Sequence, residues 1–286
     1  MDAGLMDAGL MDASLMDARF MNVSLMDATS LSSQLEFDCK LVVLDSTTST
    51  NDAILSLAQK DRQSLTAPLF VISSIQTSGR GRLGRAWASP EGGVYLSALL
   101  KLNTAEKDSG AHASLSPLAA LAVRDALQPF QSNEVQLKWP NDVLSSQGKL
   151  AGILIELRQI NKTPFAVVGI GINVRRPDAG AFEAAAYLDD DCAREPLPGE
   201  VAVAVINGLL RRYYAWQAEA CDFSSFVAAY EEHMAQIGQH VCVRNALGSE
   251  IANGVVKGID EQGRLLLSGA SGIEAIVAGE LTLRKP

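Results

Sequence analysis

The stretch Gly79-Arg80-Gly81-Arg82-Leu83-Gly84-Arg85 is the most informative part of this chain. It holds three arginines and three glycines in seven positions, in a chain of 286 residues whose formal net charge is −9. Glycine lets backbone N–H groups approach a ligand closely, and arginine supplies forked donors for phosphate or carboxylate. The stretch therefore predicts a loop that wraps an anion, with a solvated basic loop as the plainer alternative.

The residues around this stretch limit the fold class. Residues 79–84 fit the G-x-G-x-x-G pattern of dinucleotide-binding folds, which requires a strand directly before it and a helix directly after it. The apolar run Leu69–Ile75 supplies a strand, but Pro90, Gly92 and Gly93 interrupt any following helix. No acidic residue ends a second strand at the expected distance. The flanks thus argue against a dinucleotide-binding fold.

Further along the chain, strand-like apolar runs alternate with runs of helical spacing. We expect strands at Leu41–Leu44, Leu69–Ile75, Val94–Leu100 and Val135–Trp139, a hairpin of Lys149–Arg158 with Phe165–Val174, and helices at Asn51–Gln59, Ala111–Gln128, Glu200–Ala220 and Phe223–Ala235. From His240 the chain changes to five short strands separated by glycine turns, which is typical of a small β-barrel. The predicted fold class is α+β: a mixed β-sheet catalytic domain packed with helices, plus a small C-terminal barrel.

Residues 1–30 repeat every five residues as MDAGL, MDAGL, MDASL, MDARF, MNVSL and MDATS. A five-residue period keeps no single helix face apolar, so the repeat predicts a low-complexity, disordered tail over residues 1–35. A start codon placed too far upstream explains the repeat equally well, and a tethering or oligomerising role is a third interpretation. The catalytic domain is then expected over residues 36–237 and the barrel over 238–286.

The overall composition excludes several protein classes. Hydrophobic residues make up 48% and charged residues 20%, which is typical of a soluble globular enzyme. A sequence pI near 4.9 argues against general nucleic-acid binding, and no apolar run reaches 18 residues. The four cysteines are scattered without a C-x-x-C pair, which favours reduced thiols in a cytoplasmic protein over disulfides or zinc.

Two segments combine polar and charged residues at the ends of predicted elements. Ser49-Thr50-Asn51 precedes a helix, where hydroxyls and free N–H groups can bind a polar ligand head; a plain helix cap is the alternative. Lys138-Trp139-Pro140-Asn141-Asp142 ends a strand and places a cation and an anion beside one pocket. Asp142 is a candidate Mg²⁺ ligand beside a nucleotide phosphate, and a surface turn is the alternative.

Two further segments lie on the predicted hairpin. Gly148-Lys149-Leu150-Ala151-Gly152 puts a lysine at the start of an apolar strand, where it either meets an anion or extends its ammonium to water. This is not a phosphate-binding Walker loop, because Val143 and Leu150 replace the required glycine and hydroxyl residue. Gly169-Ile170-Gly171-Ile172-Asn173 carries glycines inside a strand, which often mark close approach by a ligand or another backbone; tight packing on a helix is the alternative.

The ordered combination of these motifs resembles the biotin protein ligase family. The motifs are Ser-Thr-Asn at 49–51, Gln76-x-x-Gly-Arg-Gly-Arg, Lys-Trp-Pro-Asn-Asp at 138–142, Lys149-Leu-Ala-Gly-Ile-Leu-Ile-Glu and Gly-Ile-Asn at 171–173. The resemblance covers residues 40–286 and extends to the C-terminal module, which it implies is an SH3-like β-barrel. Residues 1–39 show no helix-turn-helix pattern, so the resemblance is to the ligase-only form without a DNA-binding domain.

The resemblance implies an activity and a set of partners. Biotin's carboxylate attacks the α-phosphate of ATP to give biotinyl-5′-AMP, and a lysine of a biotin carboxyl carrier protein, of acetyl-CoA carboxylase or another biotin-dependent enzyme, then takes the biotinyl group. Mg²⁺ is the implied cofactor. No nucleic acid or membrane is implied as a partner, and a monomer or a homodimer is expected.

The resemblance also implies roles for single residues, by their numbers in this chain. Lys149 and Arg82 are implied to be catalytic, and Asp142 to lie on the metal side. The implied biotin-binding residues are Ser49, Thr50, Asn51, Gln76, Arg80, Gly81, Arg82, Lys149 and Gly152, and the implied nucleotide-binding residues are Arg85, Trp87, Lys138 and Asn173.

Two other functions compete with this interpretation. A lipoate-type protein ligase or transferase of related fold would use similar adenylate chemistry on a carrier lysine. A non-enzymatic nucleic-acid binder would use the Arg-Gly loop, but it would need a wider basic face with interleaved aromatic residues. Only three arginines cluster here, which argues against the second competitor.

Overall fold

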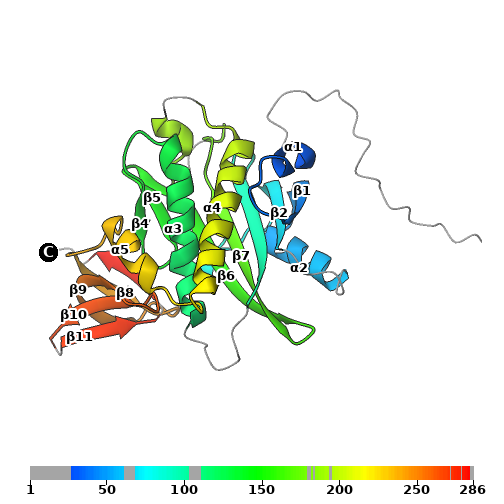
Figure 1. Ribbon diagram of the computed structural model, residues 1–286. Helices are drawn as coiled ribbons and strands as arrows, with labels where there is room; N and C mark the ends of the chain where they lie inside the picture. Colours follow the sequence, from blue (N-terminus) through cyan, green and yellow to red (C-terminus); the bar gives the residue numbers. More distant parts are fainter. Residues whose placement is uncertain are drawn as a thin grey trace, which may run out of the picture.

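The structure is a computed structural model that describes residues 27–60, 68–102, 111–178, 182, 184–192, 195–270, 272–277 and 279–283. The five-residue repeat up to residue 26 lies outside the described residues. Two β-sheets organise the described chain, one of seven strands and one of five (Figure 1).

The seven-stranded sheet has the strand order β1-β2-β3-β7-β6-β5-β4. Its first two strands pair in parallel, and every other neighbouring pair is antiparallel. The strands are β1 (Lys40–Thr47), β2 (Leu69–Gln76), β3 (Val94–Lys101), β4 (Gln136–Lys138), β5 (Asp142–Ser145), β6 (Gly148–Ile160) and β7 (Thr163–Ile172). The predicted strands and the hairpin are therefore present, and β5 is a strand that the sequence did not indicate.

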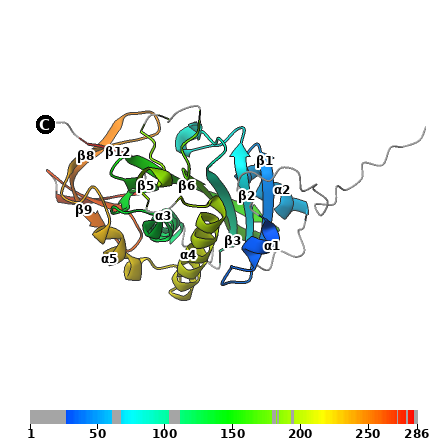
Figure 2. The same cartoon turned by 90° about the horizontal axis from the view of Figure 1, so that it is seen from above.

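Helices cover both faces of this sheet (Figures 1 and 2). The long helices α3 (Leu115–Leu127) and α4 (Pro198–Ala218) lie side by side on one face, and α2 (Thr50–Lys60) lies on the other. Alternate residues of one strand serve the two faces: Phe70 and Ile72 join the core under α3 and α4, whereas Leu69 and Val71 pack with Ile54 of α2. Two-sided burial explains why these strands are continuous apolar runs rather than alternating ones.

The C-terminal module is a five-stranded antiparallel sheet in the order β11-β10-β9-β8-β12. Its strands are β8 (His240–Arg244), β9 (Glu250–Ile259), β10 (Leu265–Gly269), β11 (Gly272–Ile276) and β12 (Glu280–Leu283), all five of which were predicted. Within the described residues the end strands β11 and β12 do not pair with each other. The described strands therefore form an open sheet, and the predicted closed barrel is not confirmed.

Specific hydrogen bonds fix this module to the larger part. The indole Nε1 of Trp139, a side chain only 1% exposed, donates to the carbonyl oxygen of Gly263 over 2.9 Å. The backbone N–H of Ile259 donates to Glu231 at 2.9 Å, on the short helix α5 (Ser224–Glu232). The sequence Lys-Trp-Pro-Asn-Asp thereby joins the two sheets at the edge of the site.

The first described residues correct part of the predicted tail. Helix α1 (Ala28–Ser32) begins after Asp27, whose carboxylate accepts from the backbone N–H groups of Thr29 and Ser30. Leu31 is only 5% exposed and belongs to the main core. The described chain from Asp27 therefore packs on the folded domain, because Asp27 caps the helix and Leu31, directly after the last copy of the repeat, is buried in the core.

The predicted helix over Ala111–Gln128 also begins later than the sequence indicated. Residues 111–114 form a 3₁₀ turn, and the α-helix starts at Leu115.

Among the helices in the described ranges, none combines the length and the apolar character that crossing a membrane requires.

Candidate active site

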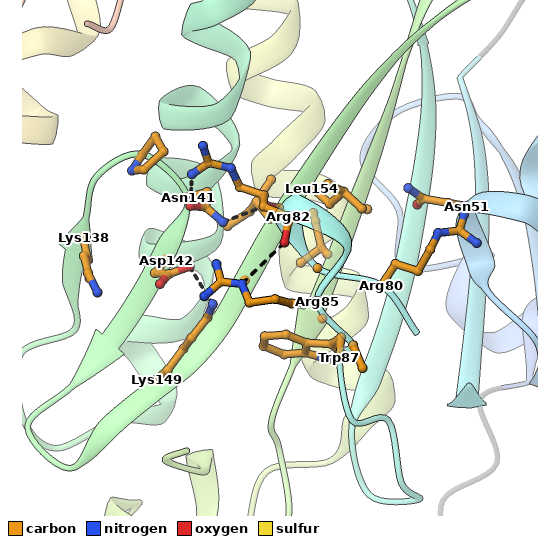
Figure 3. A pocket seen from close by; sticks show the side chains of 18 of the residues that line it. Asn51, Arg80, Arg82, Arg85, Trp87, Lys138, Asn141, Asp142, Lys149 and Leu154 are labelled. Carbon is orange, nitrogen blue, oxygen red and sulfur yellow. Dashed lines mark hydrogen bonds and ion pairs between the residues drawn. The ribbon is translucent and has the colours of Figure 1, made fainter. Parts of the chain in front are cut away.

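A cleft of about 500 Å³ lies where the two sheets meet, which is within the usual range of small-molecule sites (Figure 3). Its walls come from the start of α2, the end of β2, the loop over residues 77–88, the β4–β5 turn, β6 and β7. Arg244, Gly279 and Leu281 of the C-terminal sheet complete the lining. The sequence did not indicate that these last three residues line the site.

The Gly-Arg loop is a small hairpin rather than an open coil. Arg80 and Ala86 form an antiparallel bridge, and Gly81 N–H donates to the Arg85 carbonyl oxygen at 2.7 Å. A Cβ atom on Gly79 would come within 2.5 Å of the Trp87 carbonyl oxygen, so only glycine fits there. The tip of this hairpin, Arg82–Gly84, places Arg82 at the cleft.

The three arginines point in different directions (Figure 3). Arg80 turns toward α2, where its guanidinium makes two 2.6 Å hydrogen bonds with the carboxylate of Asp52. These bonds and the positive charge of Arg80 hold the pKa of Asp52 below its ordinary value. Arg82 turns the other way and donates to Asn141 Oδ1 at 2.9 Å and, more weakly, to the Gly279 carbonyl oxygen at 3.5 Å. Arg85 is exposed beside the Lys149 side of the cleft.

Lys149 and Asp142 form an ion pair inside the cleft, with Nζ 2.6 Å from Oδ1. The lysine side chain is 31% exposed and the aspartate side chain 18%. Asp142 and Lys149 lie on the paired strands β5 and β6, beside an irregularity in their register between Val143 and Leu144. The predicted cation and anion, Lys138 and Asp142, both line the cleft, but the cation that pairs with Asp142 is Lys149.

Trp87 lies against the glycines of the hairpin strands. Cβ atoms on Gly152 and Gly171 would come within 2.9 Å and 2.4 Å of its indole ring. The Lys149 ammonium lies 5.0 Å from the centre of that ring. The indole Nε1 is buried and has no hydrogen-bond partner within the described part of the chain. Gly152 on β6 and Gly171 on β7 therefore leave room for the Trp87 indole, whose Nε1–H is not used by the described part of the chain.

The opposite end of the cleft is neutral and buried. Ser49, Thr50 and Asn51 are 3%, 3% and 4% exposed. Gln76 Oε1 accepts from the Thr50 backbone N–H at 2.9 Å. A Cβ atom on Gly169 would come within 2.5 Å of Asn51 Oδ1, so this glycine accommodates helix α2, as the packing alternative predicted. Ser97 on β3 also lies at this end, with its Oγ 2.7 Å from Thr50 Oγ1 and 2.6 Å from Asn51 Oδ1. The only sequence signal for Ser97 is a hydroxyl inside an apolar strand.

The structure brings together all but one of the sequence-predicted site residues. Those that line the cleft are Lys149, Arg82, Ser49, Thr50, Asn51, Gln76, Arg80, Gly81, Gly152, Arg85, Trp87, Lys138 and Asp142. Asn173 is not among the lining residues, since its side chain donates to the Lys149 carbonyl oxygen at 3.0 Å. Asn173 thus supports the lysine from behind, and its nucleotide contact stays a prediction.

A metal ion would find one protein carboxylate in the cleft, that of Asp142. No group of three or more histidine, cysteine, aspartate or glutamate side chains occurs among the residues described. Mg²⁺ commonly binds through one or two carboxylates together with substrate phosphates. The donor set therefore fits Mg²⁺ carried with a nucleotide rather than a resident ion.

Comparisons with known proteins agree in both modules. Residues 43–173 match the biotin/lipoate A/B protein ligase family, and residues 237–284 match the biotin protein ligase C terminal domain. A biotin–[acetyl-CoA-carboxylase] ligase of Paracoccus denitrificans is 34% identical, over 84% of this chain and 98% of that protein. The bifunctional ligase/repressor of Escherichia coli is 31% identical, over 74% of this chain and 65% of that protein.

A solved structure shows the same fold. The biotin protein ligase of Aquifex aeolicus, in complex with biotin and ATP, matches with a TM-score of 0.70 and 29% identity. The match covers 86% of this chain and 99% of the Aquifex chain.

Proposed function

The chain belongs to the biotin protein ligase family, and we propose that it activates biotin with ATP and transfers it to a lysine of a carrier protein. In the first step the biotin carboxylate attacks the α-phosphate of ATP, which forms biotinyl-5′-AMP and releases pyrophosphate. In the second step the carrier lysine amine attacks the biotinyl carbonyl carbon, and AMP leaves.

The observation that carries this proposal is the division of one cleft into a neutral end and a cationic end. Thr50, Asn51 and Gln76 offer hydrogen-bonding groups without net charge, which suits the ureido ring of biotin. Arg82, Arg85 and Lys149 gather positive charge at the other end, in a chain whose formal charge is −9. Biotin's carboxylate and the phosphates of ATP are anions that this end attracts.

The cationic end also supplies the catalytic contribution. Negative charge shifts onto the pyrophosphate as it leaves, and preorganised donors stabilise such charge best when they are partly withdrawn from water. Lys149 is held by Asp142 at 2.6 Å and by Asn173 through its backbone carbonyl, so its position is fixed before a ligand binds. We expect the phosphate oxygens to share this ammonium with Asp142 in the bound state.

Mg²⁺ would neutralise phosphate charge, and Asp142 would hold it from the protein side. Trp87 would present its buried, unpartnered indole N–H and ring to the nucleotide, with Arg85 and Lys138 near the phosphates. Gly81 and Gly152 give a ligand room to approach the backbone, and the side chain of Arg82 would close over the carboxylate.

The buried neutral end favours biotin over lipoate. A dithiolane ring has no N–H or carbonyl group to match the hydrogen-bonding atoms of Thr50, which is buried, and of Gln76, which is half-buried. Such mismatches typically cost a site that is built for hydrogen bonds about 10⁴–10⁵ in discrimination.

Several finer features are part of the proposal. The carrier is the biotin carboxyl carrier protein of acetyl-CoA carboxylase or of another biotin-dependent enzyme, supported by the Paracoccus relative. The C-terminal sheet is taken as an SH3-like module, supported by the match over residues 237–284. A cytoplasmic ligase-only protein that binds no nucleic acid, as a monomer or homodimer, completes it.

The first step is testable by isotope exchange between pyrophosphate and ATP. Exchange that requires biotin, and that lipoate does not support, is the expected result. Exchange with lipoate but not biotin would replace the proposal with its lipoate competitor, and exchange without either acid would contradict both.

A further inference from the structure

The neutral end of the cleft is connected to a carboxylate that lies outside the lining residues. Glu156 on β6 accepts a hydrogen bond from Asn51 Nδ2, with 2.8 Å between Nδ2 and Oε2. Its other oxygen, Oε1, accepts from Arg158 Nη2, also over 2.8 Å. Neither Glu156 nor Arg158 lines the cleft, and Asn51 is the lining residue to which Glu156 is hydrogen-bonded.

This carboxylate fixes which way the Asn51 amide faces. A carboxylate only accepts hydrogen bonds, so the NH₂ group of Asn51 must face Glu156 and its Oδ1 must face Ser97. Since Oδ1 only accepts, the 2.6 Å contact with Ser97 requires the single hydroxyl proton of Ser97. Asn51 cannot swing aside, because its amide lies against Gly169 and the side chain is 4% exposed.

The same reasoning applies to Thr50, which lines the cleft. Ser97 Oγ and Thr50 Oγ1 are 2.7 Å apart, and because Ser97 has given its proton to Asn51, only the Thr50 proton can fill this contact. Thr50 Oγ1 is left with lone pairs alone. Gln76 Oε1 is 3.2 Å from Thr50 Oγ1 and accepts from the Thr50 backbone N–H. Whether the Thr50 proton goes to Ser97 or to Gln76 Oε1, it is used within the protein, so Thr50 Oγ1 can only accept a hydrogen bond from a ligand.

We propose that Glu156 is a positioning residue that sets the hydrogen-bond polarity of the relay Asn51–Ser97–Thr50, so that the cleft accepts ligand heads that donate N–H groups. The inference rests on the proposed function and sharpens it, since the ureido ring of biotin carries two such N–H groups. Ser97 is fully buried, so water cannot easily replace a member of the relay. Without the carboxylate the amide of Asn51 is free to reverse, and the polarity of the relay reverses with it.

The test compares Glu156→Leu with Glu156→Gln. The leucine variant removes the acceptor and should raise the KM for biotin about tenfold or more, while the KM for ATP stays within about twofold. The glutamine variant keeps an acceptor oxygen and should retain most of the affinity for biotin. Leu157→Ala is the matched control, since Leu157 is the next residue on β6 and is 48% exposed.

A double-mutant cycle separates the relay from a general loss of structure. In an Asn51→Ala background, Glu156→Leu should add less than about twofold to the KM for biotin, because the relay is already cut. Wild-type discrimination between biotin and a ureido-N-methylated biotin should shrink in Glu156→Leu. Equal increases in both KM values, additive effects in the cycle, or a wild-type KM for biotin in Glu156→Leu would overturn the inference.

One readout does not depend on biotin turnover. NMR of the free protein should show a slowly exchanging Asn51 side-chain N–H, bonded to the carboxylate, that is lost in Glu156→Leu and kept in Leu157→Ala. An unchanged Asn51 signal in Glu156→Leu contradicts the relay. Absence of biotin-dependent exchange by the wild-type protein contradicts the proposed function instead, so the two failures are distinguishable.

Discussion

The two ends of the cleft are built in opposite ways. At the neutral end Ser49, Thr50 and Asn51 are less than 5% exposed, and their hydrogen bonds are made within the protein. At the cationic end the Lys149 side chain is 31% exposed and pairs with the carboxylate of Asp142. The neutral end is ordered by hydrogen bonds within the protein before a ligand arrives, whereas the cationic end holds an ion pair that an anion can enter.

The difference follows from what each end costs the folded protein. A buried polar group without a partner costs about 1–3 kcal/mol, so the neutral end has to be satisfied internally. Solvent-exposed ion pairs contribute only about 0–1 kcal/mol, so exchanging one for a phosphate contact costs little. We therefore expect changes at the cationic end to act mainly on rate and retention, and changes at the neutral end on biotin binding.

The largest effect should come from Lys149→Ala. Loss of one preorganised donor typically slows a charge-building step by ~10²–10³, and we expect biotinyl-adenylate formation to slow by that factor. The fold should survive, because the lysine side chain is 31% exposed. Single-turnover formation of the adenylate, beside a melting curve, measures both; Lys101→Ala, at an exposed position on β3, is the control. A near-normal rate in the folded variant would transfer the role to Arg82 and Arg85.

Arg82→Gly should weaken retention of the adenylate. Charge-assisted hydrogen bonds contribute roughly 1.5–3 kcal/mol, which corresponds to a dissociation rate increased by about 10–150-fold. Escaped adenylate should then label lysines of bystander proteins, which mass spectrometry detects. Arg211→Gln, at an exposed arginine of α4, should leave both quantities unchanged. If the adenylate leaves Arg82→Gly at the wild-type rate, the loop does not clamp it.

Two glycines on one strand distinguish the ends directly. A Cβ on Gly169 would press on Asn51 and one on Gly171 on Trp87, at 2.5 and 2.4 Å. Overpacking of this kind destabilises the fold by about 1–3 kcal/mol and displaces the side chain that it presses on. Gly169→Ala should raise the KM for biotin, and Gly171→Ala the KM for ATP. Each variant is the control for the other. If both variants raised the same KM, the two glycines would not belong to different ends of the cleft.

The smallest effect should come from Asp52→Asn, which weakens the attachment of the loop to α2. Exposed pairs contribute about 0.2–1 kcal/mol, so amide exchange in residues 79–86 should rise about 1.5–5-fold at pH 7. Because Arg80 lowers the pKa of Asp52, the stabilisation is complete above the ordinary carboxyl range and is lost as pH falls through the lowered pKa. The difference between wild type and variant should therefore begin to shrink below about pH 4 and should vanish only below the lowered pKa of Asp52. Asp45→Asn, at an exposed position on β1, controls for loss of charge, and identical exchange at pH 7 would show that Asp52 does not hold the loop.

Much of the fold and the cleft was predictable from local sequence. Apolar runs such as Leu69–Ile75 marked the strands because two-sided burial makes them continuous. The motif residues converge because each lies at an end or turn of an element that borders the cleft. The resemblance to a family then assigned roles that spacing alone left open.

The remaining features depend on contacts distant in sequence. Glu156 reads as an ordinary polar residue of β6, and only the packing of α2 on β7 brings Asn51 to it. Gly279 reaches the cleft only through the docking of the C-terminal sheet. The folded state of residues 27–35 depends on Leu31 finding the core, which a repeat without a fold period does not indicate.

The central claim is that the two ends of this cleft bring biotin and ATP together for transfer to a carrier lysine. Its most direct test is intact mass spectrometry of a biotin carboxyl carrier domain incubated with this protein, biotin and MgATP. We predict that the carrier gains the mass of one biotinyl group at a single lysine, only when all three components are present. A carrier of unchanged mass, in the presence of folded protein, would contradict the account.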